Sequence, residues 1–160
     1  MVTVRRFEED DIEGISELWE EFAKMREDMT HNQILNENAP DYFFGYATGL
    51  LQRKDTLCLV AEDEGELAGY LIATKQRKPP IYSHTRIAYL SDVFVPDAHR
   101  KKGILTQFIT ELKAWCKNER ITAIDVMLFK ENELAQEIYR RMGFRDYRVV
   151  LRQEVGDPSA

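Results

Sequence analysis

The chain has 160 residues, 44% of them hydrophobic and 31% charged, which is enough apolar material for one folded domain and excludes global disorder. It carries 22 Lys and Arg against 28 Asp and Glu, a net charge of −6, so it is a poor general binder of nucleic acid phosphates. No apolar run reaches the ~18 residues of a membrane-spanning helix, and the N-terminus lacks the hydrophobic segment of a signal peptide. We therefore expect a cytoplasmic protein with no membrane partner.

The first third of the chain predicts one strand and two amphipathic helices. Apolar and polar residues alternate at the start, and apolar residues then recur every three or four positions, the period of a helix with one buried face. Acidic residues stand where helix N-caps belong, at Asp10 or Asp11 and at Asp41. The predicted ranges are a strand over 2–7, a helix over 12–29, a loop over 30–40 and a helix over 41–50.

From Leu57 onward the period becomes that of strands, and strands then alternate with helices. Gly65 supplies the turn of a first hairpin. The predicted strands are 57–61, 67–74, 86–95, 122–129 and 147–154, and the predicted helices are 103–119 and 133–142. The order β-α-α-β-β-β-α-β-α-β indicates a single α/β domain on one mixed sheet over residues 1–154, followed by a frayed tail, 155–160.

A cationic turn follows the strand predicted over 86–95. Arg100, Lys101 and Lys102 precede Gly103, where a helix begins. Free N–H groups at a helix N-terminus bind phosphate, and glycine lets the backbone come close to a ligand. The pattern equally fits a solvated corner with a turn glycine. It lacks the spacing of a nucleotide-hydrolysing phosphate loop or of a dinucleotide site.

A second informative segment spans the helix predicted over 133–142. Ala135 and Tyr139, four residues apart, share one helical face. Asn132 stands at the N-cap position and Gly143 at the C-cap position. Each feature alone has a purely structural explanation.

Together the two segments resemble the GCN5-related N-acetyltransferase (GNAT) family over residues 2–154. The family's [Gln/Arg]-x-x-Gly-x-[Gly/Ala] loop corresponds to residues 100–105, and its Asn-x-x-Ala-x-x-x-Tyr-x-x-x-Gly-Phe motif to residues 132–144. Residues 89–95 are similar to polyamine and related small-amine acetyltransferases.

The resemblance implies direct transfer of an acetyl group from acetyl-CoA to a primary amine of a small molecule or peptide. It also implies that the fourth strand bulges and splays from the fifth, so that the pantetheine arm lies between them. Tyr139 is the implied general acid for the leaving thiolate. The residues implied to bind the cofactor are Val93, Phe94, Val95, Arg100, Lys101, Lys102, Gly103, Ile104, Leu105, Asn132 and Tyr139.

Two positions depart from the family pattern. Leu105 stands where the loop has Gly or Ala, and Ser91 where related enzymes often carry a glutamate that acts as general base. Asp92 is the nearest carboxylate and becomes the candidate base or substrate contact, although strict alternation places it opposite Ser91 unless the bulge reorients it. Tyr82, His84 and Ser91 are candidates for acceptor binding; Tyr82 and His84 also fit ordinary loop surface.

The remaining expectations concern other functions and partners. Histidine and cysteine show no metal-ligand spacing, and neither cysteine is placed as a nucleophile. Two alternatives stay open: a protein N-terminal acetyltransferase, and a non-catalytic module that senses acyl-CoA. The acidic stretch 8–28 favours a cationic acceptor, and the last predicted strand offers a route to a homodimer.

Overall fold

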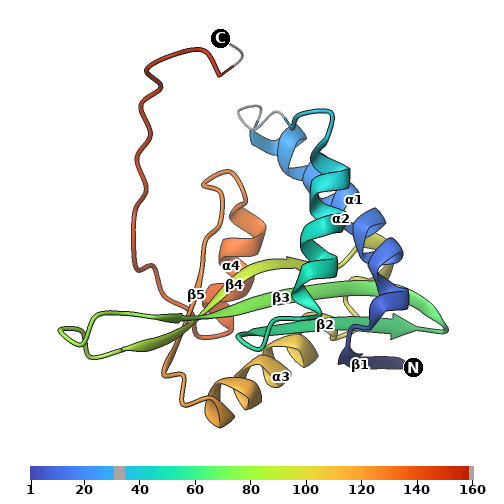
Figure 1. Ribbon diagram of the computed structural model, residues 1–160, viewed down its shortest axis with the longest axis horizontal. Coiled ribbons are helices and arrows are strands. Elements are labelled where there is room, and N and C mark those ends of the chain that lie inside the picture. Colours follow the sequence, from blue (N-terminus) through green and yellow to red (C-terminus); the bar gives the residue numbers. More distant parts are fainter. Residues whose placement is uncertain (31–34, 159–160) are drawn as a thin grey trace. The chain divides into compact units, whose positions relative to one another are not determined.

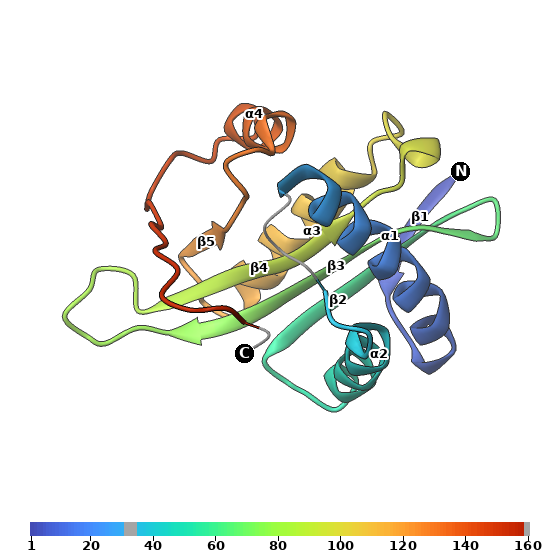
Figure 2. The same cartoon turned by 90° about the horizontal axis from the view of Figure 1, so that it is seen from above.

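The computed structural model describes residues 1–30 and 35–158, shown in two views in Figures 1 and 2. Parts of the predicted loop 30–40 and of the predicted tail lie outside these residues. The chain forms two units, Met1–Met127 and Leu128–Ala160. The first contains β1 (Val2–Arg6), η1 (Glu9–Asp11), α1 (Ile12–Thr30), α2 (Ala39–Leu50), β2 (Thr56–Asp63), β3 (Glu66–Arg77), β4 (Arg86–Phe94), η2 (Asp97–His99), α3 (Ile104–Asn118) and β5 (Ala123–Val126); the second contains α4 (Glu133–Arg141).

The first unit is built on one five-stranded sheet in the order β1-β2-β3-β4-β5. Neighbouring strands are antiparallel except β4 and β5, which are parallel and joined through α3. Helices α1 and α2 cover one face of the sheet and α3 covers the other, as Figure 1 shows. The predicted α/β architecture with a mixed sheet is confirmed.

The core lies on both faces of β2, which is buried along almost its whole length, and of the central part of β3, residues 68–73. One cluster joins α1 and α2 to the sheet and includes Ile15, Phe43 and Tyr70. On the opposite face Phe108 and Leu112 of α3 are fully buried. The described helices include none with the length and apolar content needed to span a membrane.

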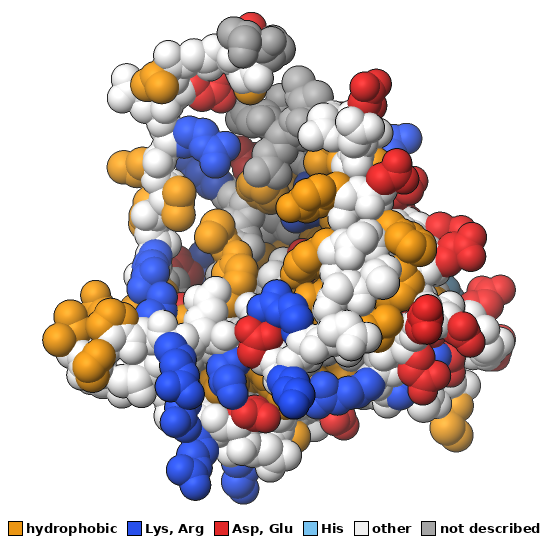
Figure 3. Space-filling view, viewed as in Figure 1, with side chains coloured by type: hydrophobic (Ala, Val, Ile, Leu, Met, Phe, Trp, Pro, Cys, Tyr) orange, Lys and Arg blue, Asp and Glu red, His pale blue; other side chains and the backbone are white. Residues whose placement is uncertain are grey.

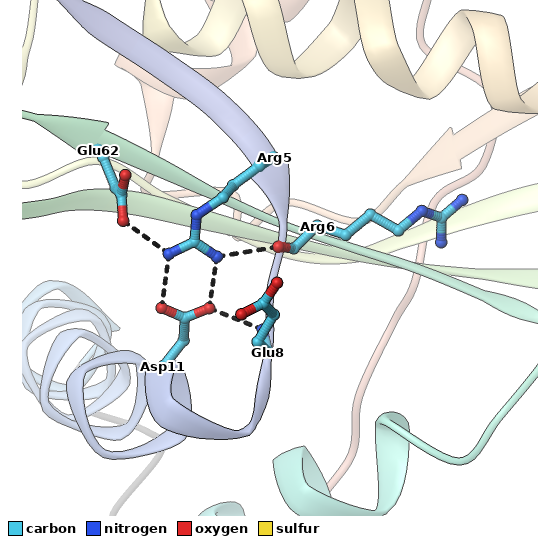
Figure 4. A network of polar contacts seen from close by, with 5 residues as sticks. All are labelled: Arg5, Arg6, Glu8, Asp11 and Glu62. Carbon is cyan, nitrogen blue, oxygen red and sulfur yellow. Dashed lines mark hydrogen bonds and ion pairs between the residues drawn. The ribbon is translucent and has the colours of Figure 1, made fainter.

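An ionic network ties η1 to the sheet (Figure 4). The Arg5 guanidinium donates to both carboxylate oxygens of Asp11, at 2.7 and 2.9 Å, and to Glu62 Oε1 at 2.6 Å. Asp11 also accepts the backbone N–H of Glu8 at 2.7 Å, so it caps η1, the turn that leads into α1. The hydrogen bond from Arg5 holds the pKa of Asp11 below its ordinary value.

Several element boundaries differ from those predicted. Helix α2 starts at Ala39, with Asn38 rather than Asp41 at its N-cap, because Pro40 suits a first helical turn whose N–H groups need no partner. Strand β3 runs to Arg77, and β5 ends at Val126 instead of residue 129.

The strand predicted over 147–154 is wrong for the single chain. These residues form no strand, and Tyr147, Val149 and Leu151 are 64%, 85% and 89% exposed. The β-branched and aromatic composition suits a strand, but a strand also requires a neighbour with which to pair its backbone. Among the described residues, no strand pairs with this segment.

Candidate functional site

Strand β4 carries the bulge that the resemblance implied. Asp92 lies opposite Ile72 of β3, whereas the next residue of β3, Ala73, lies opposite Leu90. Ser91 is therefore an extra residue in β4, and its hydroxyl donates to the carbonyl of Ile72 at 3.1 Å. A bulge of this kind bends the strand and redirects its side chains.

Beyond the bulge, β4 separates from β5. The parallel pairing covers only Ile87–Leu90 of β4 and Ala123–Val126 of β5, while β4 continues to Phe94. In the described part of the chain, the edge of β4 that faces away from β3 is therefore without a strand partner over residues 91–94. The predicted splay of the two strands is confirmed.

Of the three residues predicted to bind the cofactor through their backbone, Val93, Phe94 and Val95, only one has its backbone groups free at this edge. The carbonyl oxygen of Phe94 faces β3, where a Cβ added to Gly69 would lie 2.8 Å from it. The carbonyl of Val95 accepts a hydrogen bond from Arg100 Nε at 3.0 Å. Because backbone groups alternate in direction along a strand, Val93 directs its N–H and C=O to the free edge.

Asp92 lies on the sheet face covered by α1 and α2, opposite the buried Ile72. Its Oδ2 accepts a hydrogen bond from the hydroxyl of Tyr70, at 3.2 Å, and the Tyr70 side chain is fully buried. Burial raises the pKa of Asp92 to about 6, although the positive charge of Arg26 and the hydrogen bond from Tyr70 act in the opposite direction. Asp92 is thus a carboxylate that can exchange a proton near neutral pH.

Tyr46 of α2 extends the same group of side chains. It interacts with both Asp92 and Ser91, so the bulge does bring Ser91 and Asp92 near one side chain. Burial raises the pKa of Tyr46, and the negative charge of Asp92 raises it further. Tyr46 is 38% exposed, so this group of side chains extends from the buried Tyr70 to the protein surface.

The start of α3 has the features of an anion site. Gly103 occupies the N-cap position with φ +78°, and no side chain caps the helix. The first bond into the helix runs from Gln107 N–H to the carbonyl of Gly103, so the N–H groups of the preceding three residues, 104–106, have no partner within the helix. Leu105, which departs from the family pattern, is partly buried.

The three predicted cations differ in their availability. Arg100 pairs with Asp97 at 2.6 Å, in addition to its bond to Val95. Lys102 pairs with Asp63, which also lies 3.3 Å from His99. Lys101 forms an ion pair with no residue that the structure describes, and its φ of 62° holds the turn in a left-handed conformation. Lys101 is therefore the cation that can meet an anion without first breaking an ion pair.

In the second unit, several residues of the 132–144 motif have structural roles around α4. The side chain of Asn132 accepts the N–H of Ala135 at 3.2 Å and caps α4, while Gly143 ends the helix with φ +96°. The ring of Phe144 packs edge-on against Tyr139, with centroids 5.2 Å apart. Tyr139 is 4% exposed, and its buried hydroxyl has no hydrogen-bond partner among the described residues. Burial raises the pKa of this hydroxyl.

Tyr82 and His84 do not join Asp92. Both lie in the connection before β4, where the ring of His84 contacts the Thr122 hydroxyl at 2.8 Å. Asp92 lies six positions along β4 from Arg86, where the strand begins, a span of roughly 20 Å. The structure therefore places Ser91 at the bulge but leaves the other two acceptor candidates at the opposite end of the strand.

The acidic residues of α1 line a different surface. Figure 3 shows Asp and Glu gathered over the side where α1 and the β2–β3 turn lie, and Lys and Arg over the side of α3. An open groove of about 570 Å³ runs along α1 and residues 35–40, and none of the predicted site residues lines it. The carboxylates that line it are Glu17, Glu20, Glu21, Glu27 and Glu37.

The environments of the cysteines and of the other potential metal ligands can be described from residues 1–30 and 35–158. Cys58 and Cys116 are buried, and burial raises the pKa of each thiol to about 11. In residues 1–30 and 35–158, no cluster of three or more His, Cys, Asp or Glu side chains is arranged to hold a metal ion.

Comparisons with known proteins agree with this architecture. BH1408 from Bacillus halodurans, solved as a tetramutant, superposes with a TM-score of 0.85 at 19% identity and covers 96% of this chain and 99% of its own. AAC(6')-Iy, in complex with the bisubstrate analogue CoA-S-monomethyl-acetylneamine, gives 0.75 at 17% identity, covering 98% and 99%. At these identities the likeness shows the fold.

Sequence comparison identifies the family. The uncharacterized N-acetyltransferase YobR of Bacillus subtilis is 38% identical over 55 residues, which are 34% of this chain and only 22% of that protein. The sequence profile of the acetyltransferase (GNAT) family matches residues 15–144, most of the chain. The protein therefore belongs to the acetyltransferase (GNAT) family.

Proposed function

We propose that the protein moves an acetyl group from acetyl-CoA to an amine of a small molecule or peptide. The observation that carries this proposal is the bulge in β4: it leaves the edge at residues 91–94 unpaired and places the Asp92 carboxylate, with a pKa of about 6, beside that edge. Family membership supports the reaction class, and the CoA-containing analogue bound to AAC(6')-Iy supports the donor.

The residues present fit the donor. Lys101 and the free N–H groups at the start of α3 can bind a diphosphate, and the free backbone of Val93 can pair with the amide groups of a pantetheine arm. The orphaned hydroxyl of Tyr139 is a second indication, because a buried hydroxyl without a partner is costly unless a ligand supplies one. Acetyl-CoA, when bound, supplies the activated acyl carbon as a thioester.

Asp92 is the proposed general base. A primary amine has a pKa of about 10 and must lose a proton before it can attack. With a pKa of about 6, Asp92 is largely ionised at pH 7 and can accept that proton directly or through water. The hydroxyl of Tyr70 fixes one carboxylate oxygen, which leaves the other to face the amine.

Tyr139 is the proposed general acid. Its raised pKa keeps the hydroxyl protonated throughout the physiological range, so a proton is always present to stabilise a departing thiolate. Asn132 already uses its side-chain oxygen to cap α4, which leaves its amide nitrogen for the predicted hydrogen bond to the cofactor.

We further propose a homodimer in which the exposed segment 147–154 pairs with the outer edge of β5 in a second copy. Strand β5 is the last strand of the sheet, all four of its residues are partly exposed, and the segment is rich in strand-forming residues. Sedimentation velocity tests this: Val149→Glu with Leu151→Glu should yield monomers, whereas Val155→Glu, in the tail, should not. Dimers that persist in the double variant would exclude this interface.

The function is tested by following free thiol from acetyl-CoA against a panel of diamines, aminoglycosides, amino acids and peptide N-termini. An acetyltransferase releases thiol in proportion to acetylated amine. Binding of acetyl-CoA without thiol release on any acceptor supports the sensor instead, and activity confined to peptide N-termini supports the protein N-terminal acetyltransferase. A cytoplasmic location stays a prediction from the sequence.

A further inference from the structure

Arg26 of α1 is a partly buried cation that is not held in an ion pair by any of the described residues. Its Nε is buried and has no hydrogen-bond partner, and its guanidinium forms no ion pair with any residue described in the structure. Its guanidinium carbon lies 4.2 Å from the centroid of the Phe22 ring. A partly desolvated arginine with unused donors favours an anionic ligand, because the fork of N–H groups matches a carboxylate.

Arg26 lies beside the proposed acceptor site. The ring of Phe22 stacks on Phe94, with centroids 5.0 Å apart and planes within 7° of parallel. Phe94 and Asp92 are two residues apart on β4 and therefore share the sheet face covered by α1 and α2. The electrostatic influence of Arg26 on both Asp92 and Tyr70 agrees with this placement.

The site therefore presents one negative and one positive group on the same face. An acceptor with two or more ammonium groups would bring a second cation toward Arg26, and like charges repel at short range. An acceptor with one ammonium and one carboxylate complements both Asp92 and Arg26. The acidic groove along α1 does not alter this balance, because neither residue lines it.

We propose that Arg26 binds a carboxylate of the acceptor, so that the amine acetylated by this protein belongs to a zwitterion such as an amino acid. This inference rests on the proposed acetyltransferase function and names the acceptor class for the same site. It differs from the expectation of a cationic acceptor, which came from the charge of residues 8–28 as a whole. In this proposal the acceptor binds next to Asp92 and Arg26, and not at the acidic surface of α1.

The test compares amino acids with their carboxamides, which keep the amine and lose the carboxylate. The wild-type kcat/KM should favour the carboxylates by at least tenfold, even though the amide's less basic amine is more often neutral. Arg26→Gln keeps a stem to pack on Phe22, and it should lower kcat/KM for the carboxylates by roughly 10- to 100-fold, as expected when a charge-assisted pair is lost. Because the charge of Arg26 also lowers the pKa of Asp92, the variant can slow every acceptor, so the readout is the ratio of carboxylate to carboxamide activity, which should fall by roughly 10- to 100-fold.

Two matched variants complete the experiment. Lys24→Gln makes the same charge change on the exposed side of α1 and should leave the preference intact. Arg26→Lys keeps the charge but loses the forked pair of donors, so it should retain part of the preference for carboxylates that Arg26→Gln loses. If carboxylates and carboxamides react equally, or if Arg26→Gln changes only the KM for acetyl-CoA, the carboxylate assignment is wrong while the proposed function stands. If no amine in the panel is acetylated, both fail.

Discussion

Replacing Asp92 with asparagine should lower activity and raise stability at the same time. The change keeps the shape of the side chain, and its amide oxygen can still accept the hydrogen bond from Tyr70. What is lost is the ability to accept a proton. General base catalysis supplies about 10²–10⁴-fold, so kcat should fall by that range.

The gain in stability follows from the same burial. The pKa of Asp92 is raised from 3.8 to about 6, so folding favours the protonated form. Below pH 3.8 the carboxyl is neutral in both states and costs nothing; above pH 6 it is ionised in both, and the native state bears the penalty. At about 1.4 kcal/mol per pKa unit, that penalty is on the order of 3 kcal/mol.

The assays are kcat/KM against pH and chemical denaturation at pH 4 and pH 8. Wild-type kcat/KM should rise with pH through pH 6 and then level off. The kcat/KM of Asp92→Asn should not show this rise around pH 6. The variant should be more stable than wild type at pH 8 and nearly equal at pH 4. Asp41→Asn makes the same charge change at an exposed position in the first turn of α2 and serves as the control. A variant that retains wild-type kcat, or that is less stable at pH 8, would refute the reasoning.

Three further predictions test other parts of the account. Tyr139→Phe should lower kcat by about 10²–10⁴-fold with little change in stability, because the lost hydroxyl has no partner; unchanged turnover would leave Tyr139 a packing residue. Gly103→Ala should reduce stability by about 1 kcal/mol, because φ is +78°. In calorimetry it should weaken the binding of CoA more than the binding of a pantetheine fragment, which lacks the diphosphate. Equal losses of affinity for the two ligands would show that the diphosphate does not bind at the start of α3. Arg5→Met should destabilise by about 1–2 kcal/mol at pH 7, because Asp11 loses its partner. The folded pKa of Asp11 is depressed, so this difference should shrink as acid protonates the carboxylate; a difference independent of pH would contradict the ion-pair explanation.

Local sequence patterns were sufficient for much of the fold. Periodicity located four helices and five strands within a few residues, and the two motifs located the α3 start and the Tyr139 helix. The Asp92 hypothesis depended on the bulge, which the resemblance supplied and the strand register confirms. Periodicity alone would have assigned Asp92 and Ser91 to opposite faces.

The residues that sequence reasoning missed act through contacts between distant segments. Tyr70 and Tyr46 fit apolar stripes and read as core, and Arg26 reads as one charge among many on α1. Nothing in their local pattern shows that they converge on Asp92, because that depends on how α1, α2 and β3 pack. Gly69 gives a weak signal, a glycine inside a strand, which often marks a close approach of backbone.

Composition and position along the chain do not show which segments lie together in space. Tyr82 and His84 stay candidates for acceptor binding, but they precede Arg86, at the opposite end of the nine-residue strand β4 from Asp92. The segment 147–154 has the composition of a strand, yet strand formation depends on a partner that composition cannot reveal.

The central claim is that the bulge in β4 brings the acetyl donor and the base together, and a crystal structure with coenzyme A tests it most directly. We expect the diphosphate at the start of α3, the pantetheine arm along residues 91–94, and Asp92 as the carboxylate nearest the sulfur. A coenzyme bound elsewhere, or a different carboxylate nearer to the sulfur, would contradict it.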